Sequence, residues 1–247
     1  MKEFAKIHKK YTFGKNYLGR FFFTSKKPME QLQKLIFAND FHKVNSAFKL
    51  FQRHFNTIFK KDLPVLKNWK KLIEANLKKN SKITQEIDKR LSILYETKPS
   101  RQIIKIFLLL SAGKTSGGGA NIEKQKSITL EISGSPPEKI NDALGIVWHE
   151  LIHLYFEKEN YCPLIEKTLP QVPEDKKMKI REATTSALFP NGILGKRYLG
   201  LKSKGALHFS LLKASQTIPL LKMTKEYVGK NLALDESYIK KIYRIIK

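Results

Sequence analysis

The chain has 247 residues, a formal net charge of +25 and a single cysteine, Cys162. This length is enough for a large buried core, and no run of about 18 uncharged apolar residues occurs, so a transmembrane span is not expected. A lone cysteine excludes an internal disulfide framework and is typical of a reducing compartment. The first residues lack an apolar segment followed by a small-residue cleavage site, which indicates a cytoplasmic protein without a secretory signal.

The excess of positive charge is compatible with binding to nucleic acid, to an anionic membrane surface or to acidic partners. Most of the 47 basic residues are lysines, and they are spread over the chain in pairs such as Lys60-Lys61 and Lys176-Lys177. Proteins that read nucleic acid specifically rely on arginine for bidentate contacts. Scattered lysines are typical of solvated helix faces, so we expect at most non-specific, salt-dependent binding to polyanions.

Residues 1–98 form a basic region in which helical periodicity begins at Pro28. Phe21-Phe22-Phe23 precedes this point and indicates a short strand or an anchoring segment. Leu63-Pro64 predicts a break between two helices. A longer set of apolar residues recurs at steps of three and four, which predicts one buried helix face. Its members are Phe41, Val44, Phe48, Phe51, Phe55 and Phe59.

Residues 99–247 differ in character and form the second expected unit. Arg101 to Leu110 and Ser127 to Ser133 have strand patterns. The glycine-rich stretch Gly117 to Asn121 lies between them and predicts a turn that joins an antiparallel pair. Two helical pieces are expected after Leu201, with a break near Gly229. The expected class is therefore α+β, predominantly helical, with a small antiparallel sheet.

The most informative motif is His149-Glu150-Leu151-Ile152-His153, which lies within an apolar helical run. Positions i and i+4 share one face of a helix, so both imidazoles can bind one zinc ion. Glu150 is offset by about 100° around the axis and can reach a water molecule on that ion. The motif therefore predicts two zinc ligands beside a general base.

The helix that carries this motif is expected to run from Ser135 to about Lys158. Ser135 suits the N-cap, and Glu138 completes a capping box. A loop with Pro163 is expected next, followed by a second helix from Glu174 to Leu188.

Zinc catalysis usually needs a third protein ligand. Glu157 lies two turns from His149, too far along the helix axis to close the site. Glu182, on the second helix, is the expected third ligand. The alternatives are His208 and, more weakly, Glu166 and Glu174.

This arrangement resembles the gluzincins, the thermolysin-like zinc peptidases, over residues 101–190. The resemblance implies zinc bound by His149, His153 and Glu182, with Glu150 as the base. It also implies an oxyanion-stabilising side chain, for which Tyr198 and His208 are the candidates. The spacing to Glu182 is longer than in thermolysin, and Ser186 stands where the thermolysin pattern has Asp, so the residue that orients a zinc-bound histidine is not identified.

From these features we expect a zinc metallopeptidase whose Glu150 base activates the attacking water. A peptide or protein substrate would lie along Ser127 to Ser133, taken as the edge strand, by strand addition. Zinc hydrolysis of a non-peptide amide or ester is also compatible with the motif. The alternative is a basic helical protein that binds nucleic acid or a membrane surface, with a structural or vestigial metal site.

Overall fold

The computed structural model of the chain describes residues 27–98, 103–110, 117–121, 126–132, 140–201 and 212–247. Its α-helices are α3 (Pro28–Leu35), α4 (Ala38–Lys79), α5 (Ser81–Tyr95), α6 (Ile140–Leu151), α7 (Cys162–Thr168), α8 (Glu174–Leu188), α9 (Ile193–Leu199), α10 (Ala214–Lys230) and α11 (Glu236–Ile246). A π-helix, η2 (Ile152–Tyr161), joins α6 to α7, and the strands are β1 (Lys105–Leu110), β2 (Gly117–Asn121) and β3 (Ser127–Ile132). The expectation of a predominantly helical α+β fold is confirmed for these residues.

The sheet is mixed, and the prediction of an antiparallel pair between residues 101–110 and 127–133 is wrong. The strand order is β1-β3-β2, with β1 parallel and β2 antiparallel to β3. The glycine-rich stretch predicted as a turn is itself β2. Because a strand is inserted between β1 and β3, the chain reverses twice and these two run in the same direction. β3 is consequently the central strand, and β1 and β2 are the edges.

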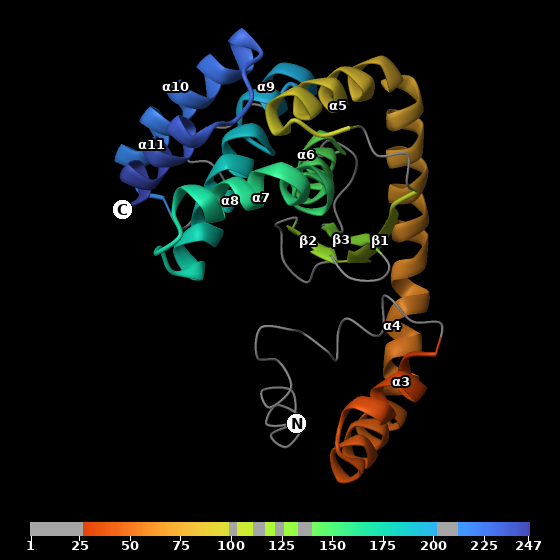
Figure 1. The fold of residues 1–247 in the computed structure, drawn as a ribbon. Coiled ribbons are helices and arrows are strands. Elements are labelled where there is room, and N and C mark those ends of the chain that lie inside the picture. Colours follow the sequence, from red (N-terminus) through yellow and green to blue (C-terminus); the bar gives the residue numbers. More distant parts are fainter. Residues whose placement is uncertain (1–26, 99–102, 111–116, 122–125, 133–139, 202–211) are drawn as a thin grey trace.

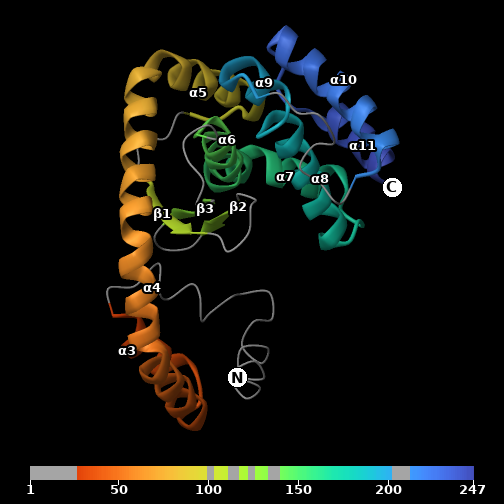
Figure 2. The same ribbon diagram turned by 180° about the vertical axis from the view of Figure 1, so that it is seen from behind.

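One face of the sheet carries the α6 helix. Successive side chains of a strand point to opposite faces, and Ile128, Leu130 and Ile132 of β3 are all fully buried on one of them. They share a core with residues of α6 and with Trp69 and Ile73 of α4. Figures 1 and 2 show α6 above the strands, with α4 passing beside the sheet and continuing beyond it.

The β2 strand approaches α6 closely because it lacks side chains there. A Cβ atom on Gly118 would lie 2.5 Å from Cγ2 of Ile146 and 3.1 Å from Cγ of Glu150. A Cβ atom on Gly119 would meet nothing within 4 Å. The glycine at position 118 is therefore what brings the edge strand against the helix that carries the motif.

That helix is longer than predicted and changes its winding. α6, η2 and α7 follow one another without interruption from residue 140 to residue 168, so Pro163 is helical and not in a loop. Within an α-helix, its ring would clash with the carbonyl four residues earlier. The wider π turn before α7 relieves this clash, and Pro163 stands in the first turn of α7. The expected cap at Ser135 lies outside the described residues.

Several other helices have the predicted limits. α8 begins at Glu174 and ends at Leu188, as expected. The break near Gly229 is confirmed by the end of α10 at Lys230 and the start of α11 at Glu236. α5, η2, α7, α8, α10 and α11 enclose a second apolar core. Since α5 and part of α4 share cores with later residues, the proposed division at residue 98 stays a prediction.

Two predictions for α4 are wrong. The helix does not break at Pro64 but runs through it for 42 residues. Pro64 is exposed, so the carbonyl that loses its helical partner can bond to water. The apolar face predicted to be buried is covered only in part, because Phe48, Phe51, Phe55 and Phe59 are exposed. No described helix is both long and apolar enough to cross a membrane.

The contact between β2 and α6 gives a first testable prediction. Gly118→Ala should lower the free energy of unfolding by about 1–3 kcal/mol, because the added methyl group overlaps Ile146 and Glu150. Gly119→Ala, one residue along the same strand, should change it by less than about 0.5 kcal/mol. Urea unfolding of both variants measures the difference. Equal stability of the two would show that β2 does not pack on α6 as described.

Candidate metal centre

The two histidines of the motif stand side by side at the junction of α6 and η2. Nε2 of His149 lies 3.1 Å from Nε2 of His153, and their ring centroids are 4.8 Å apart. His153 is buried, and the side chain of His149 is 14% exposed. The spacing of four residues on a helix therefore brings both nitrogens to one point.

Both imidazoles are oriented through their other ring nitrogen. Nδ1 of His149 lies 3.1 Å from the carbonyl oxygen of Phe189, which can only accept a hydrogen bond. Nδ1 of His153 lies 3.1 Å from Oε2 of Glu157. Because both neighbours are acceptors, each Nδ1 carries the proton and donates it. In their neutral forms, both rings then direct an Nε2 lone pair toward the same place.

Glu182 of α8 completes the cluster. Its Oε2 lies 3.6 Å from Nε2 of His149, and its Oε1 lies 3.5 Å from Nε2 of His153. One ligand atom from each of the three residues can be chosen so that all lie within 4.8 Å of one another. Tetrahedral zinc with ligands at about 2.0–2.2 Å places neighbouring ligand atoms about 3.3–3.5 Å apart. The donor set and its spacing therefore fit zinc.

The charges of the cluster are those of a site that attracts a cation. Burial acts to lower the pKa of His153, but its hydrogen bonds to Glu157 and Glu182 outweigh burial and raise the pKa to about 10. Burial acts to raise the pKa of Glu182, yet the two imidazoles hold it well below its ordinary value. A proton on His153 offsets the carboxylates here, and a metal ion bound at Nε2 would replace that proton.

Glu157 is the residue that orients His153, and sequence reasoning missed this role. It is fully buried, and its two oxygens accept hydrogen bonds from Arg181 Nε at 3.0 Å and Thr185 Oγ1 at 2.8 Å in addition to that of His153. Burial alone would raise the pKa of Glu157, but the hydrogen bond with His153 lowers it. Ser186, at the position of the thermolysin Asp, is buried, and its hydroxyl has no hydrogen-bond partner among the described residues. The useful signal was a Glu four residues after His153, on the same helix face.

The π-helix keeps the side chains that follow His149 at intervals of four residues directed at α8. Four residues of an α-helix overshoot a full turn by about 40°, whereas four residues of a π-helix fall short of it by about 33°. The row His149, His153, Glu157 and Tyr161 therefore drifts little along the helix. All four side chains reach α8 or its end, and Tyr161 does so through a 2.7 Å hydrogen bond to Thr184.

Glu150 lies beside the cluster and faces the edge strand. Its side chain is buried next to Gly118, and the backbone of Ala120 hydrogen-bonds its carboxyl. Burial raises the pKa of Glu150 above its ordinary value, while His149 and His153 act in the opposite direction. A carboxylate in this position is placed to exchange a proton with a molecule held between the cluster and β2.

The Phe189 carbonyl is held in place by close backbone packing after α8. A Cβ atom on Gly145, one turn before His149, would lie 2.8 Å from Cβ of Pro190. A Cβ atom on Gly195 would lie 1.8 Å from the Pro190 oxygen. These contacts leave no room for side chains, so the segment after α8 sits directly on α6. The sequence motif gave no sign of this acceptor.

The other candidate site residues are placed elsewhere or lie outside the described residues. The hydroxyl of Tyr198 donates a 3.3 Å hydrogen bond to Glu86 of α5 and is not in the metal cluster. Glu166 is paired with Lys177, and Glu174 begins α8 two turns before Glu182. His208 lies outside the described residues.

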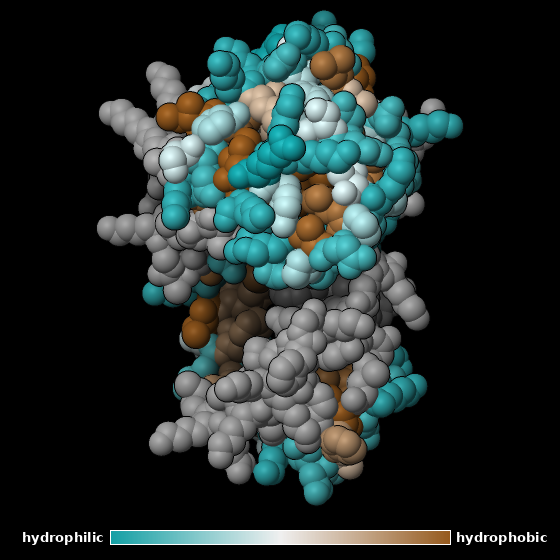
Figure 3. Space-filling model, turned by 60° about the vertical axis from the view of Figure 1, so that its left-hand side comes forward, coloured by the Kyte–Doolittle hydropathy of each residue, from teal (hydrophilic) through white to brown (hydrophobic). Residues whose placement is uncertain are grey.

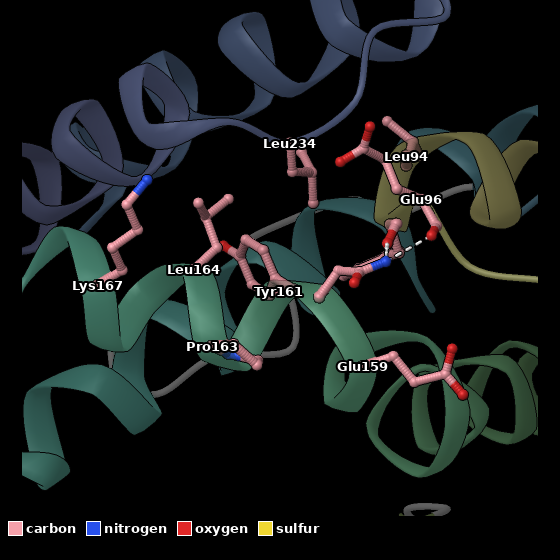
Figure 4. Close-up of a pocket in the computed structure, with 10 residues that line it drawn as sticks. Leu94, Glu96, Glu159, Tyr161, Pro163, Leu164, Lys167 and Leu234 are labelled. Carbon is pink, nitrogen blue, oxygen red and sulfur yellow. Dashed lines mark hydrogen bonds between the residues drawn. The ribbon is translucent and has the colours of Figure 1, made fainter.

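A pocket of about 290 Å³ lies at the C-terminal end of η2 and has none of the three cluster residues in its lining. Figure 4 shows Tyr161, Leu164 and Leu234 around it, with Glu159 at one side. Asn160 closes one wall by donating a hydrogen bond to the carbonyl of Glu96. This pocket is therefore separate from the metal cluster, and Glu159 serves as a reference position on the same helix as Glu157.

Comparison with protein families, with curated proteins and with solved structures gives no match for this chain. The chemistry of the cluster therefore rests on the geometry of His149, His153 and Glu182.

The role of Glu157 can be tested by zinc affinity. Glu157→Gln should weaken zinc binding by about 10–100-fold, because a neutral amide orients His153 less firmly and lowers its basicity as a ligand. Glu159→Gln, two residues along and exposed, should leave the affinity unchanged. Competition with a chromogenic chelator measures both variants. Unchanged affinity in Glu157→Gln would show that the carboxylate does not support the ligand.

Proposed function

We propose that the chain is a zinc-dependent peptide hydrolase of the gluzincin type. The observation that carries this proposal is the convergence of two Nε2 lone pairs and the Glu182 carboxylate, with Glu150 next to them. Three ligands leave a fourth position of tetrahedral zinc for water or substrate, which distinguishes catalytic from structural sites. The zincin-like packing of residues 99–247 is part of the same proposal.

His149, His153 and Glu182 would hold the ion. Bound zinc would supply a Lewis acid that lowers the pKa of a water molecule to near 7 and polarises a carbonyl group. Glu150 would accept the proton from the attacking water and pass it to the departing amine. Burial of Glu150 favours this exchange, because a carboxylate in an apolar setting holds and releases a proton closer to neutral pH.

The substrate would bind along β2. β3 is paired on both sides and has no free edge, so the edge expected at residues 127–133 is unsuitable. β2 is an edge strand and lies against Glu150 at Gly118. An extended peptide added to β2 would bring a backbone carbonyl next to the base, and this binding mode uses main-chain hydrogen bonds common to all peptides.

Tyr198 or His208 would stabilise the oxyanion. Tyr198 would have to release Glu86 before it could serve. His208 remains the other proposed donor.

Zinc content is the first test of the proposal. The purified protein should contain about one zinc per chain by elemental analysis, and His149→Ala and Glu182→Ala should each lose it. His54→Ala, on the exposed face of α4, is the matched control and should retain it. Absence of zinc after supplementation, with salt-dependent binding to a polyanion, would favour the basic binding protein instead.

The general base gives a second test. Glu150→Gln should retain zinc but lose about 10²–10⁴-fold in hydrolysis of a quenched-fluorescent peptide library, because the amide cannot take the proton from water. Zinc should be measured on the same preparation, so that a lost ion is not mistaken for a lost base. Normal turnover with zinc present would refute the assigned role.

A further inference from the structure

One face of α4 is apolar along nearly its whole length, but only its two ends are covered by described residues. At the first end, Phe41 and Val44 pack around Leu32 and Ile36. At the other end, Trp69 packs against the sheet and α6. The residues between these ends continue the same steps of three and four. We call those from residue 51 onward the α4 stripe, and they are Phe51, Phe55, Ile58 and Phe59.

The α4 stripe is exposed to an unusual degree. The exposed fraction reaches 63% for Phe55 and 59% for Ile58, and the rings of Phe55 and Phe59 stack with centroids 6.0 Å apart. Single exposed apolar residues are ordinary on protein surfaces, but a contiguous aromatic patch usually has a binding partner. The elements around the stripe indicate the kind of partner that fits.

The stripe is flanked at both ends by packed parts of the fold. Because Phe41 and Trp69 lie on the same helix face as the stripe, the α3 end and the sheet both stand on that side of α4. The stripe between them covers 8 residue steps, or about 12 Å. Figure 3 shows apolar surface of described residues set back below the upper part of the molecule. A flat bilayer cannot lie against a short stretch of helix flanked in this way, whereas one polypeptide segment can.

The N-terminal residues of the chain are a suitable partner for the α4 stripe, because they join the fold beside it. α3 turns back along the beginning of α4, so the start of α3 lies further along α4 than its end (Figure 1). Residues 1–26, outside the described part, therefore join the fold at the near end of the stripe. They contain six aromatic residues within 13 positions, and Phe23 is only five residues before Pro28. Five extended residues span about 17 Å, enough to reach the stripe.

We propose that the segment Phe21-Phe22-Phe23 docks on the α4 stripe of the same chain. Burial of both aromatic sets removes apolar area from water. The tether gives the segment an effective concentration near the millimolar range, which a second chain would rarely match. Both partners carry lysine and arginine, such as Arg20 and Arg53, but exposed like charges are screened at physiological salt. The contact is thus apolar and independent of the metal cluster.

Cysteine pairs in the full-length chain test the proposal. In a Cys162→Ser background, Phe22→Cys is combined with Phe51→Cys on the stripe or with Leu50→Cys as control. Leu50 adjoins Phe51 and is 71% exposed, but lies about 100° away around the helix. The 22–51 disulfide within one chain should form at least about tenfold faster than the 22–50 disulfide, because only the stripe is docked.

Two results would overturn the proposal. Equal rates for the two pairs would mean that the segment has no preferred face of α4. Links at position 51 that join two chains would make a second copy the occupant. As a second measurement, Phe55→Cys is labelled with a maleimide. Its thiol should react at least about fivefold faster once Phe21, Phe22 and Phe23 are all changed to serine, because undocking of the segment exposes it. An unchanged rate would contradict docking, whether or not the chain binds zinc.

Discussion

Glu157 has no exposed surface, and a carboxylate in such a place requires partners for both of its oxygens. It finds one on its own helix, His153, and two on α8, Arg181 and Thr185. The buried charge thus fixes η2 and α8 relative to each other, and Glu182 is the residue next to Arg181. Removing one partner of a buried ion pair typically costs about 3–5 kcal/mol. The position of the third ligand therefore depends on the hydrogen bonds of Glu157 with Arg181 and Thr185, none of which is itself a ligand.

The same arrangement explains why the cluster is ready for a cation. Two acceptors, the Phe189 carbonyl and Glu157, take the Nδ1 protons, so the lone pairs of both histidines meet at Glu182. Without a positive charge, these lone pairs and the carboxylate would repel one another at 3.1–3.6 Å. A proton on His153 removes this repulsion for only one pair of atoms, whereas a metal ion bound by all three residues removes it for every pair. The packing around the cluster thereby keeps the three ligand groups close together, an arrangement that a bound metal ion stabilises.

Sequence reasoning succeeded where the determining forces are local. The His149–His153 pair follows from helical spacing, and the ends of α8 follow from Pro173 and Pro190, which restrict the backbone on either side. It failed where distant contacts decide. The parallel pairing of β1 and β3 depends on the inserted β2, whose glycines resemble a turn until α6 is known to lie against Gly118. The pairing of Glu157 with α8 and the role of Phe189 likewise depend on packing between distant segments, which no short pattern encodes.

The α4 helix shows the limit of periodicity in another way. A repeat of three and four residues identifies one face of a helix, and Phe55 lies on the same face as Phe41 and Trp69. It does not say whether anything covers that face. Near its C-terminal end this face packs against the sheet and α6, and at its start it packs against α3. Because α4 is one unbroken helix between these two contacts, its apolar face also continues through the residues that lie between them. The exposed aromatic residues in that interval then require an occupant of their own.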